Sequence, residues 1–80
     1  MLRLMIVDDE QIIREALSSM IDYTSLGYEV IATAKNGMEA YDRIRDDYPD
    51  VVITDIKMPI LNGLELIERA SRIDSRITFI

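Results

Sequence analysis

The chain is short, acidic and free of several residue types that enzymes use at their active sites. It has 80 residues without cysteine or histidine, which excludes disulfides, thiol nucleophiles, imidazole catalysis and zinc sites built from these side chains. A net charge of −6 argues against nucleic-acid binding by this segment, and no apolar run suits a signal peptide or a membrane span. These limits indicate one small, soluble, intracellular domain, or part of one.

The first half of the chain predicts a strand, a helix and a second strand. Leu2–Val7 is an apolar run typical of a buried strand, and apolar residues then recur at helical spacing over residues 12–21. The acidic residues 8–10 between these two elements suit the positive end of a helix dipole. Residues 24–27 interrupt the helical pattern, and Tyr28–Ala34 is predicted to be the second strand.

Two Asn-Gly-x-Glu segments predict the starts of two further helices. Asn36 and Asn62 are each followed three residues later by Glu, as in a capping box. The helix after Asn36 should end before Pro49, because the residue preceding proline avoids helical geometry. Val51–Thr54 is the expected third strand between these helices, and residues 77–80 begin a fourth strand.

The alternation of strands and helices predicts an α/β fold, a doubly wound parallel sheet with right-handed crossovers. Ligand sites of such sheets lie beyond the carboxyl ends of the strands. Asp8 and Asp9 follow the first strand and Asp55 follows the third. Three carboxylates are therefore expected at one edge of the sheet.

The chemistry of this acidic edge favours a hard cation. Carboxylates that lie close together repel one another unless protons or a cation compensate their charge, and Mg²⁺ binds through one or two carboxylates together with phosphate oxygens. Aspartate can also act as a nucleophile and form an aspartyl-phosphate. Each acidic element alone could equally be a helix cap or a turn residue. The residue types do not choose Asp55 over Asp8 or Asp9 as the nucleophile.

Three segments together resemble the receiver domain of two-component response regulators. They are Met-Ile-Val-Asp-Asp-Glu at residues 5–10, Asp-Ile-Lys-Met-Pro at residues 55–59, and Gly63. The resemblance covers all 80 residues and implies a flavodoxin-like sheet in which the strands lie in the order second, first, third, fourth. Residues 23–28 and 55–59 are most similar to receivers joined to helix-turn-helix transcriptional outputs of the arabinose-regulator type.

The resemblance also implies a role for each site residue. Asp55 would accept a phosphoryl group from a sensor histidine kinase, in a signalling domain that is not an enzyme. Asp9, Asp55 and the backbone carbonyl of Lys57 would ligate Mg²⁺, and Asp8 would support the metal through water. The loop that presents the site would be shaped by Met58, Pro59 and Gly63.

Some parts of the family pattern have no counterpart here. Family receivers carry a Ser or Thr after the fourth strand and a Lys after the fifth, and neither Thr78 nor Lys57 nor Lys35 matches these positions. Residues 1–80 are therefore expected to form a partial receiver domain that lacks the fourth helix, the fifth strand and the fifth helix. Such a fragment would expose apolar surface beside the first helix and an edge at the fourth strand, which predicts self-association.

Two other classes of function remain open. The chain could be an assembly module that folds and self-associates without switching. It could also be an enzyme or a flavin protein, although an aspartate-nucleophile phosphatase needs a second acid where Lys57 stands. A flavodoxin would need a phosphate-binding loop after the first strand, where residues 8–10 are acidic.

Overall fold

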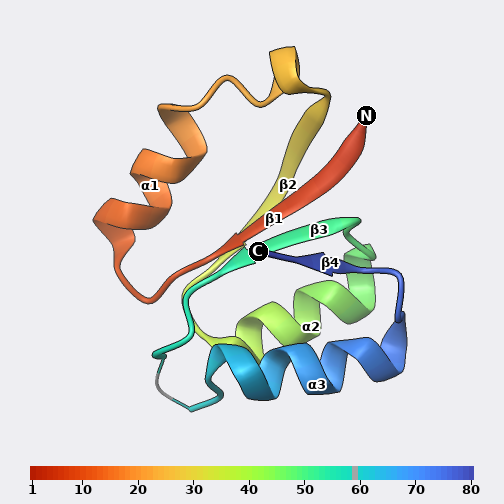
Figure 1. Cartoon of the computed structure of the whole chain (residues 1–80). Coiled ribbons are helices and arrows are strands. Elements are labelled where there is room, and N and C mark those ends of the chain that lie inside the picture. Colours follow the sequence, from red (N-terminus) through yellow and green to blue (C-terminus); the bar gives the residue numbers. More distant parts are fainter. Residues whose placement is uncertain (59) are drawn as a thin grey trace.

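The computed structural model describes residues 1–58 and 60–80, which form an α/β fold with one sheet (Figure 1). The order of the elements confirms the predicted alternation of strands and helices. Among the described residues, no helix has both the length and the apolar character needed to cross a bilayer. The elements are β1 (Leu2–Val7), α1 (Gln11–Ser19), a 3-10 turn η1 (Thr24–Leu26), β2 (Tyr28–Ala34), α2 (Gly37–Asp47), β3 (Val51–Thr54), α3 (Gly63–Ile73) and β4 (Thr78–Phe79).

The sheet has four strands, all parallel, in the order β2-β1-β3-β4. This is the flavodoxin-like order that the resemblance implied. β1 is central and pairs with β2 on one side and with β3 on the other, so that Val7 lies opposite both Ala34 and Thr54. The β1–β2 register shifts after Leu4, because Ile31 is an extra residue in β2. Because Val7 and Thr54 are the last residues of their strands and pair with each other, the ends of β1 and β3 are level. The residues that follow them therefore lie side by side.

Helices α2 and α3 cover one face of the sheet, and α1 lies on the other side (Figure 1). Alternate residues of each strand point to opposite faces, so β1 and β3 contribute to both. The core under α2 and α3 is well sealed, since its residues are nearly inaccessible to solvent. It contains Met5, Val7, Ala34, Ala40, Ile44, Val52, Met58, Leu61, Leu66 and Ala70.

The face of the sheet that α1 shares is thinly covered. Within the described part of the chain, its buried cluster consists of Leu4, Ile6, Tyr23 and Val51. The helix predicted after the acidic residues is present, but it contains no buried residue and its apolar stripe stays largely exposed. Ile12 is 81% exposed and Met20 is 82% exposed, and Leu17 is the side chain of α1 that packs against the cluster.

The two predicted helix caps are confirmed. The Asn36 side chain accepts a hydrogen bond from the Glu39 N–H at 2.8 Å, and Asn62 accepts one from the Glu65 N–H at 2.9 Å. The helix α2 ends at Asp47, and its C-cap Tyr48 has a left-handed backbone and precedes Pro49. The fourth strand is shorter than predicted, although Ile80 beyond it still donates a backbone hydrogen bond to Val52.

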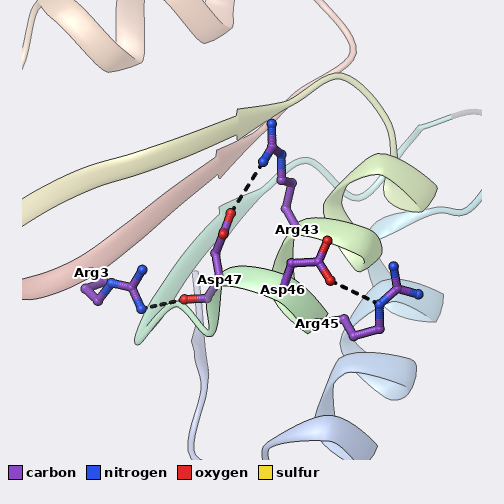
Figure 2. A network of polar contacts seen from close by, with 5 residues as sticks. All are labelled: Arg3, Arg43, Arg45, Asp46 and Asp47. Carbon is purple, nitrogen blue, oxygen red and sulfur yellow. Dashed lines mark hydrogen bonds and ion pairs between the residues drawn. The ribbon is translucent and has the colours of Figure 1, made fainter.

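A polar network joins the amino end of β1 to the end of α2 (Figure 2). The Arg3 guanidinium donates to the backbone carbonyls of Asp47 and Tyr48, and the Arg3 N–H donates to the Asp50 carboxylate at 2.8 Å. Asp47 also pairs with Arg43 at 3.6 Å. These contacts satisfy carbonyl groups at the carboxyl end of α2, where a cation also complements the helix dipole.

Ile60 is the one β-branched residue in the described part of the chain with a left-handed backbone, at φ 72°. Its side chain is 76% exposed, so no burial compensates this strain. We expect Ile60→Gly to raise the free energy of unfolding by about 1 kcal/mol, since glycine adopts this conformation without a steric penalty. Urea denaturation measures the change, and a loss of stability would contradict the assigned backbone conformation.

Tyr23 carries a buried hydroxyl group without a hydrogen-bond partner among the described residues. We expect Tyr23→Phe to raise the free energy of unfolding by about 1 kcal/mol, because it removes an unsatisfied polar group and keeps the ring. Tyr28→Phe, on the same face, is the matched control and should change stability less.

The same burial predicts a pH dependence. Burial raises the pKa of the Tyr23 phenol above its ordinary value of 10.0. The unfolded chain therefore ionises first, so stability is intact below pH 10.0 and falls as the pH rises above it. Urea titrations at neutral and alkaline pH should show a smaller alkaline loss in Tyr23→Phe than in the wild type. Equal losses would mean that the phenol is solvated in the folded state.

Candidate functional site

Three carboxylates meet at the carboxyl edge of the sheet, as the sequence predicted. Asp8 and Asp9 follow β1 and Asp55 follows β3, and one carboxylate oxygen from each lies within 4.8 Å of the other two. Asp8 is buried, Asp55 is half-buried and Asp9 is exposed. The cluster is therefore held from the sheet side and open on the solvent side.

The backbone of the sheet fixes the relative positions of the two acidic segments. The Asp8 N–H donates to the Ala34 carbonyl at 3.1 Å, and the Asp55 N–H donates to the Val7 carbonyl at 3.0 Å. Both residues thus continue the hydrogen-bond ladder of the parallel strands by one step. A shift of either segment along the sheet would break these bonds, so the convergence of the carboxylates follows from strand register.

Local hydrogen bonds orient two of the three carboxylates. Asp8 Oδ1 accepts from the Glu10 N–H at 2.9 Å, and Asp55 Oδ1 accepts from the Lys57 N–H at 3.2 Å. In each case the Asp carboxylate accepts a hydrogen bond from the backbone N–H two residues later, which is the usual way in which Asp stabilises a turn. Each of the two carboxylates keeps its other oxygen for a ligand.

The donor set of this cluster fits a divalent cation bound by oxygen. Within the described part of the chain, none of the three carboxylates forms an ion pair with Lys or Arg. No direct ion pair with a protein cation among these residues therefore compensates their mutual repulsion. Mg²⁺ prefers carboxylate and carbonyl oxygens and retains several water molecules, which an open edge of this kind allows.

The loop after Asp55 packs tightly beneath the site. Met58 and Leu61 are buried, and the Gly63 N–H donates to the Ile56 carbonyl at 2.9 Å. A Cβ atom on Gly63 would lie 2.5 Å from the Asp55 carbonyl oxygen, so the close approach of α3 requires glycine there. Pro59, which the sequence also assigned to this loop, lies outside the described residues.

Arg14 also belongs to this region, although no motif in the sequence pointed to it. Its guanidinium donates to the backbone carbonyl of Asp8 at 2.7 Å from the second turn of α1. A cation near the amino end of a helix opposes the helix dipole. An arginine at this unfavourable position therefore indicates, from the sequence alone, that its side chain makes a specific contact.

Comparison with protein families decides the family. The profile of the response regulator receiver domain matches residues 4–80. The chain belongs to this family. Over its full length this receiver domain is 42% identical to the uncharacterized transcriptional regulatory protein YesN of Bacillus subtilis (strain 168), of which it covers 22%.

Solved receiver structures agree with the fold. The receiver domain of AraT, a response regulator from Geobacillus stearothermophilus, superposes with a TM-score of 0.92 at 35% identity, over 98% of this chain and 60% of that chain. The two-component transcriptional regulator AraC from Clostridium phytofermentans ISDg gives 0.90 at 30% identity, over 99% and 64% respectively. The resemblance to receivers of arabinose-type regulators is thus supported by structure. The chain spans less than two thirds of each of these relatives.

Proposed function

We propose that Asp55 is the phosphoryl acceptor of this receiver domain and that the reaction depends on Mg²⁺. The convergence of the Asp8, Asp9 and Asp55 carboxylates within 4.8 Å supports this proposal. Asp55 is the suitable nucleophile because it is half-buried and keeps one oxygen free of hydrogen bonds to the described residues. Asp8 is less suitable, since it is buried.

In the proposed reaction, a carboxylate oxygen of Asp55 forms a bond to phosphorus as the bond between phosphorus and the donor breaks. The electron pair of the broken bond passes to the imidazole nitrogen of a kinase phosphohistidine, or to acetate when acetyl phosphate is the donor. Bound Mg²⁺ would neutralise charge on the phosphoryl oxygens, which is its usual part in phosphoryl transfer.

We assign the metal to Asp9, Asp55 and the Lys57 backbone carbonyl, with Asp8 as an indirect support. Asp9 is exposed and Asp55 half-buried, so both can reach a hydrated ion at the edge of the sheet. The Lys57 backbone is already held beside Asp55 by the hydrogen bond at 3.2 Å. Asp8 lies deeper and is suited to contact the ion through water.

Response-regulator receivers are signalling domains that generally interact with sensor histidine kinases. For this chain we propose such a kinase as the phosphodonor, a cytoplasmic location, and control of transcription by the longer protein to which the domain belongs. The chain covers 60% of the AraT receiver structure, which supports reading residues 1–80 as part of a receiver domain. With a net charge of −6, direct contact of this segment with nucleic acid is not expected.

The proposal is tested by incubating the chain with Mg²⁺ and acetyl phosphate and measuring the intact mass. We expect a mass increase of one phosphoryl group that requires Mg²⁺ and is lost in Asp55→Asn. Asp46→Asn, an exposed position on α2, is the matched control and should be phosphorylated like the wild type. Phosphorylation of the Asp55→Asn protein would refute the assignment of the acceptor.

A second candidate function is an assembly module, and the open face of the sheet favours it. An apolar hollow of about 130 Å³ on this face is lined by Leu4, Tyr23, Leu26, Tyr28, Val51, Ile53 and Ile80. Ile80 is 71% exposed next to the short edge strand β4. Self-association through this edge and the exposed side of α1 would remove apolar surface from water.

Sedimentation over a range of protein concentrations tests this second candidate. We expect a dimer or larger species that Ile80→Asp shifts towards monomer. A single monomeric species at high concentration would exclude the assembly module. Mg²⁺ binding without phosphorylation would favour assembly over the switching function.

A further inference from the structure

The acidic loop between β1 and α1 is tethered at several points to different parts of the fold. The Asp8 N–H is bound to β2 through Ala34, and the Asp8 carboxylate is bound to the Glu10 N–H. The remaining polar group of Asp8, its backbone carbonyl, accepts the Arg14 guanidinium at 2.7 Å. Arg14 therefore joins α1 to the end of β1, in addition to the bond between the Asp8 carboxylate and the Glu10 N–H.

The hydrogen bond from Arg14 matters for the position of α1 because this helix packs weakly against the sheet. The helix contains no buried residue, so apolar contacts alone do not fix the position of its first turn. A hydrogen bond from a charged donor is shorter and stronger than one between neutral groups. The N-cap of α1 is Glu10, whose side chain makes no cap hydrogen bond, so this end is held by the Asp8 carboxylate, which accepts a hydrogen bond from the Glu10 N–H, and by Arg14.

Arg14 makes this contact in preference to an ion pair. Its guanidinium pairs with no carboxylate in residues 1–58 or 60–80, although Glu10 precedes it by four positions, a spacing that suits a helical ion pair. Pairing with Asp9 would compete with a metal ion for that carboxylate. Binding the Asp8 carbonyl instead leaves the acidic side chains free.

We propose that Arg14 is a positioning residue: by holding the Asp8 carbonyl, it fixes the loop that presents Asp8 and Asp9 to Asp55. This inference rests on the proposed function where it concerns Mg²⁺. The prediction about the loop itself can be tested without metal. Arg14 acts through Asp8 and has no contact with the phosphoryl group in this proposal.

The first test is amide hydrogen exchange in metal-free protein, measured by NMR for the wild type, Arg14→Gln and Arg14→Lys. We expect exchange at the Glu10 amide to rise about tenfold in Arg14→Gln, as the loss of a charge-assisted hydrogen bond implies. The Glu65 amide, which is held by a similar bond at the start of α3, should be unchanged. Arg14→Lys keeps a charged donor and should restore most of the protection at Glu10.

The second test is Mg²⁺ titration followed by amide shifts. Removing a positive charge beside a cation site should by itself tighten Mg²⁺ binding, whereas loss of positioning should weaken it. We expect about tenfold weaker binding in Arg14→Gln, by the same loss of a charge-assisted bond, and recovery in Arg14→Lys. Arg69→Gln makes the same charge change at an exposed position on α3 and should leave the affinity unchanged.

Each result separates the alternatives. Tighter Mg²⁺ binding in Arg14→Gln with unchanged Glu10 exchange would overturn the proposal, because Arg14 would then act only as a charge. Faster exchange throughout the protein, Glu65 included, would also overturn it, because the role would be general stability. If the wild type bound no Mg²⁺, the proposed function would fail, and the exchange at Glu10 would still decide the role of Arg14.

Discussion

Gly63→Ala is expected to lower the free energy of unfolding by about 2–3 kcal/mol, as overpacking of a tight contact does. The added Cβ atom would lie 2.5 Å from the Asp55 carbonyl oxygen and 2.9 Å from the Ile56 Cα atom. Both are backbone atoms and cannot rotate away, so either α3 or the Asp55 segment has to move. Urea denaturation measures the loss, which exceeds the helix propensity that alanine adds.

Gly27→Ala is the control for this substitution. Gly27 has a positive φ of 86°, but a Cβ atom there would meet nothing within 4 Å. Gly27→Ala should therefore lower the free energy of unfolding only through backbone strain, by about 1 kcal/mol. Gly63→Ala should also slow phosphorylation of Asp55, whereas Gly27→Ala should not. Equal effects of both substitutions on stability and phosphorylation would contradict a specific contact between α3 and the site.

Asp55→Asn should have opposite effects on stability with and without metal. In metal-free protein at low salt, it should raise the free energy of unfolding by about 1 kcal/mol, because one of three mutually repelling charges is removed. In the wild type, Mg²⁺ at about 100 times its dissociation constant should add about 2.7 kcal/mol, and this gain should be lost in Asp55→Asn. The wild type would then be the more stable protein when metal is present.

The control for this prediction is again Asp46→Asn, whose carboxylate forms an exposed pair with Arg45 at 3.3 Å. Exposed pairs contribute little, so its stability should change by a few tenths of a kcal/mol and should not depend on Mg²⁺. Raising the salt concentration should shrink the metal-free gain of Asp55→Asn, since screening weakens the repulsion. A metal-free Asp55→Asn protein that is less stable than the wild type would show that the carboxylate makes a favourable contact instead.

The helix starts could be predicted because their hydrogen bonds are local. Asn36 and Asn62 each bond to the N–H three residues onward, so the sequence carries both partners within four positions. Local hydrogen bonds of this kind form in most tertiary contexts. The end of α2 before Tyr48 was predictable for a similar reason, because Pro49 restricts the residue before it.

The place of the candidate site was also predictable, through a general property of parallel sheets. Buried strands that alternate with helices leave their carboxyl ends at one edge, so Asp8, Asp9 and Asp55 had to meet if the strands were neighbours. The sheet order and the distances within 4.8 Å agree with that expectation. Which carboxylate accepts the phosphoryl group was implied by the family resemblance and stays a proposal.

The sequence by itself therefore determined the element order, the caps and the acidic edge, because each rests on short-range bonds or on a rule of topology. Tertiary structure alone decided that Arg14 binds a backbone carbonyl, that Gly63 touches Asp55, and that the stripe of α1 stays exposed. These contacts depend on the angle at which each helix meets the sheet. That angle is set by packing between segments distant in sequence, and no local pattern of residues encodes it.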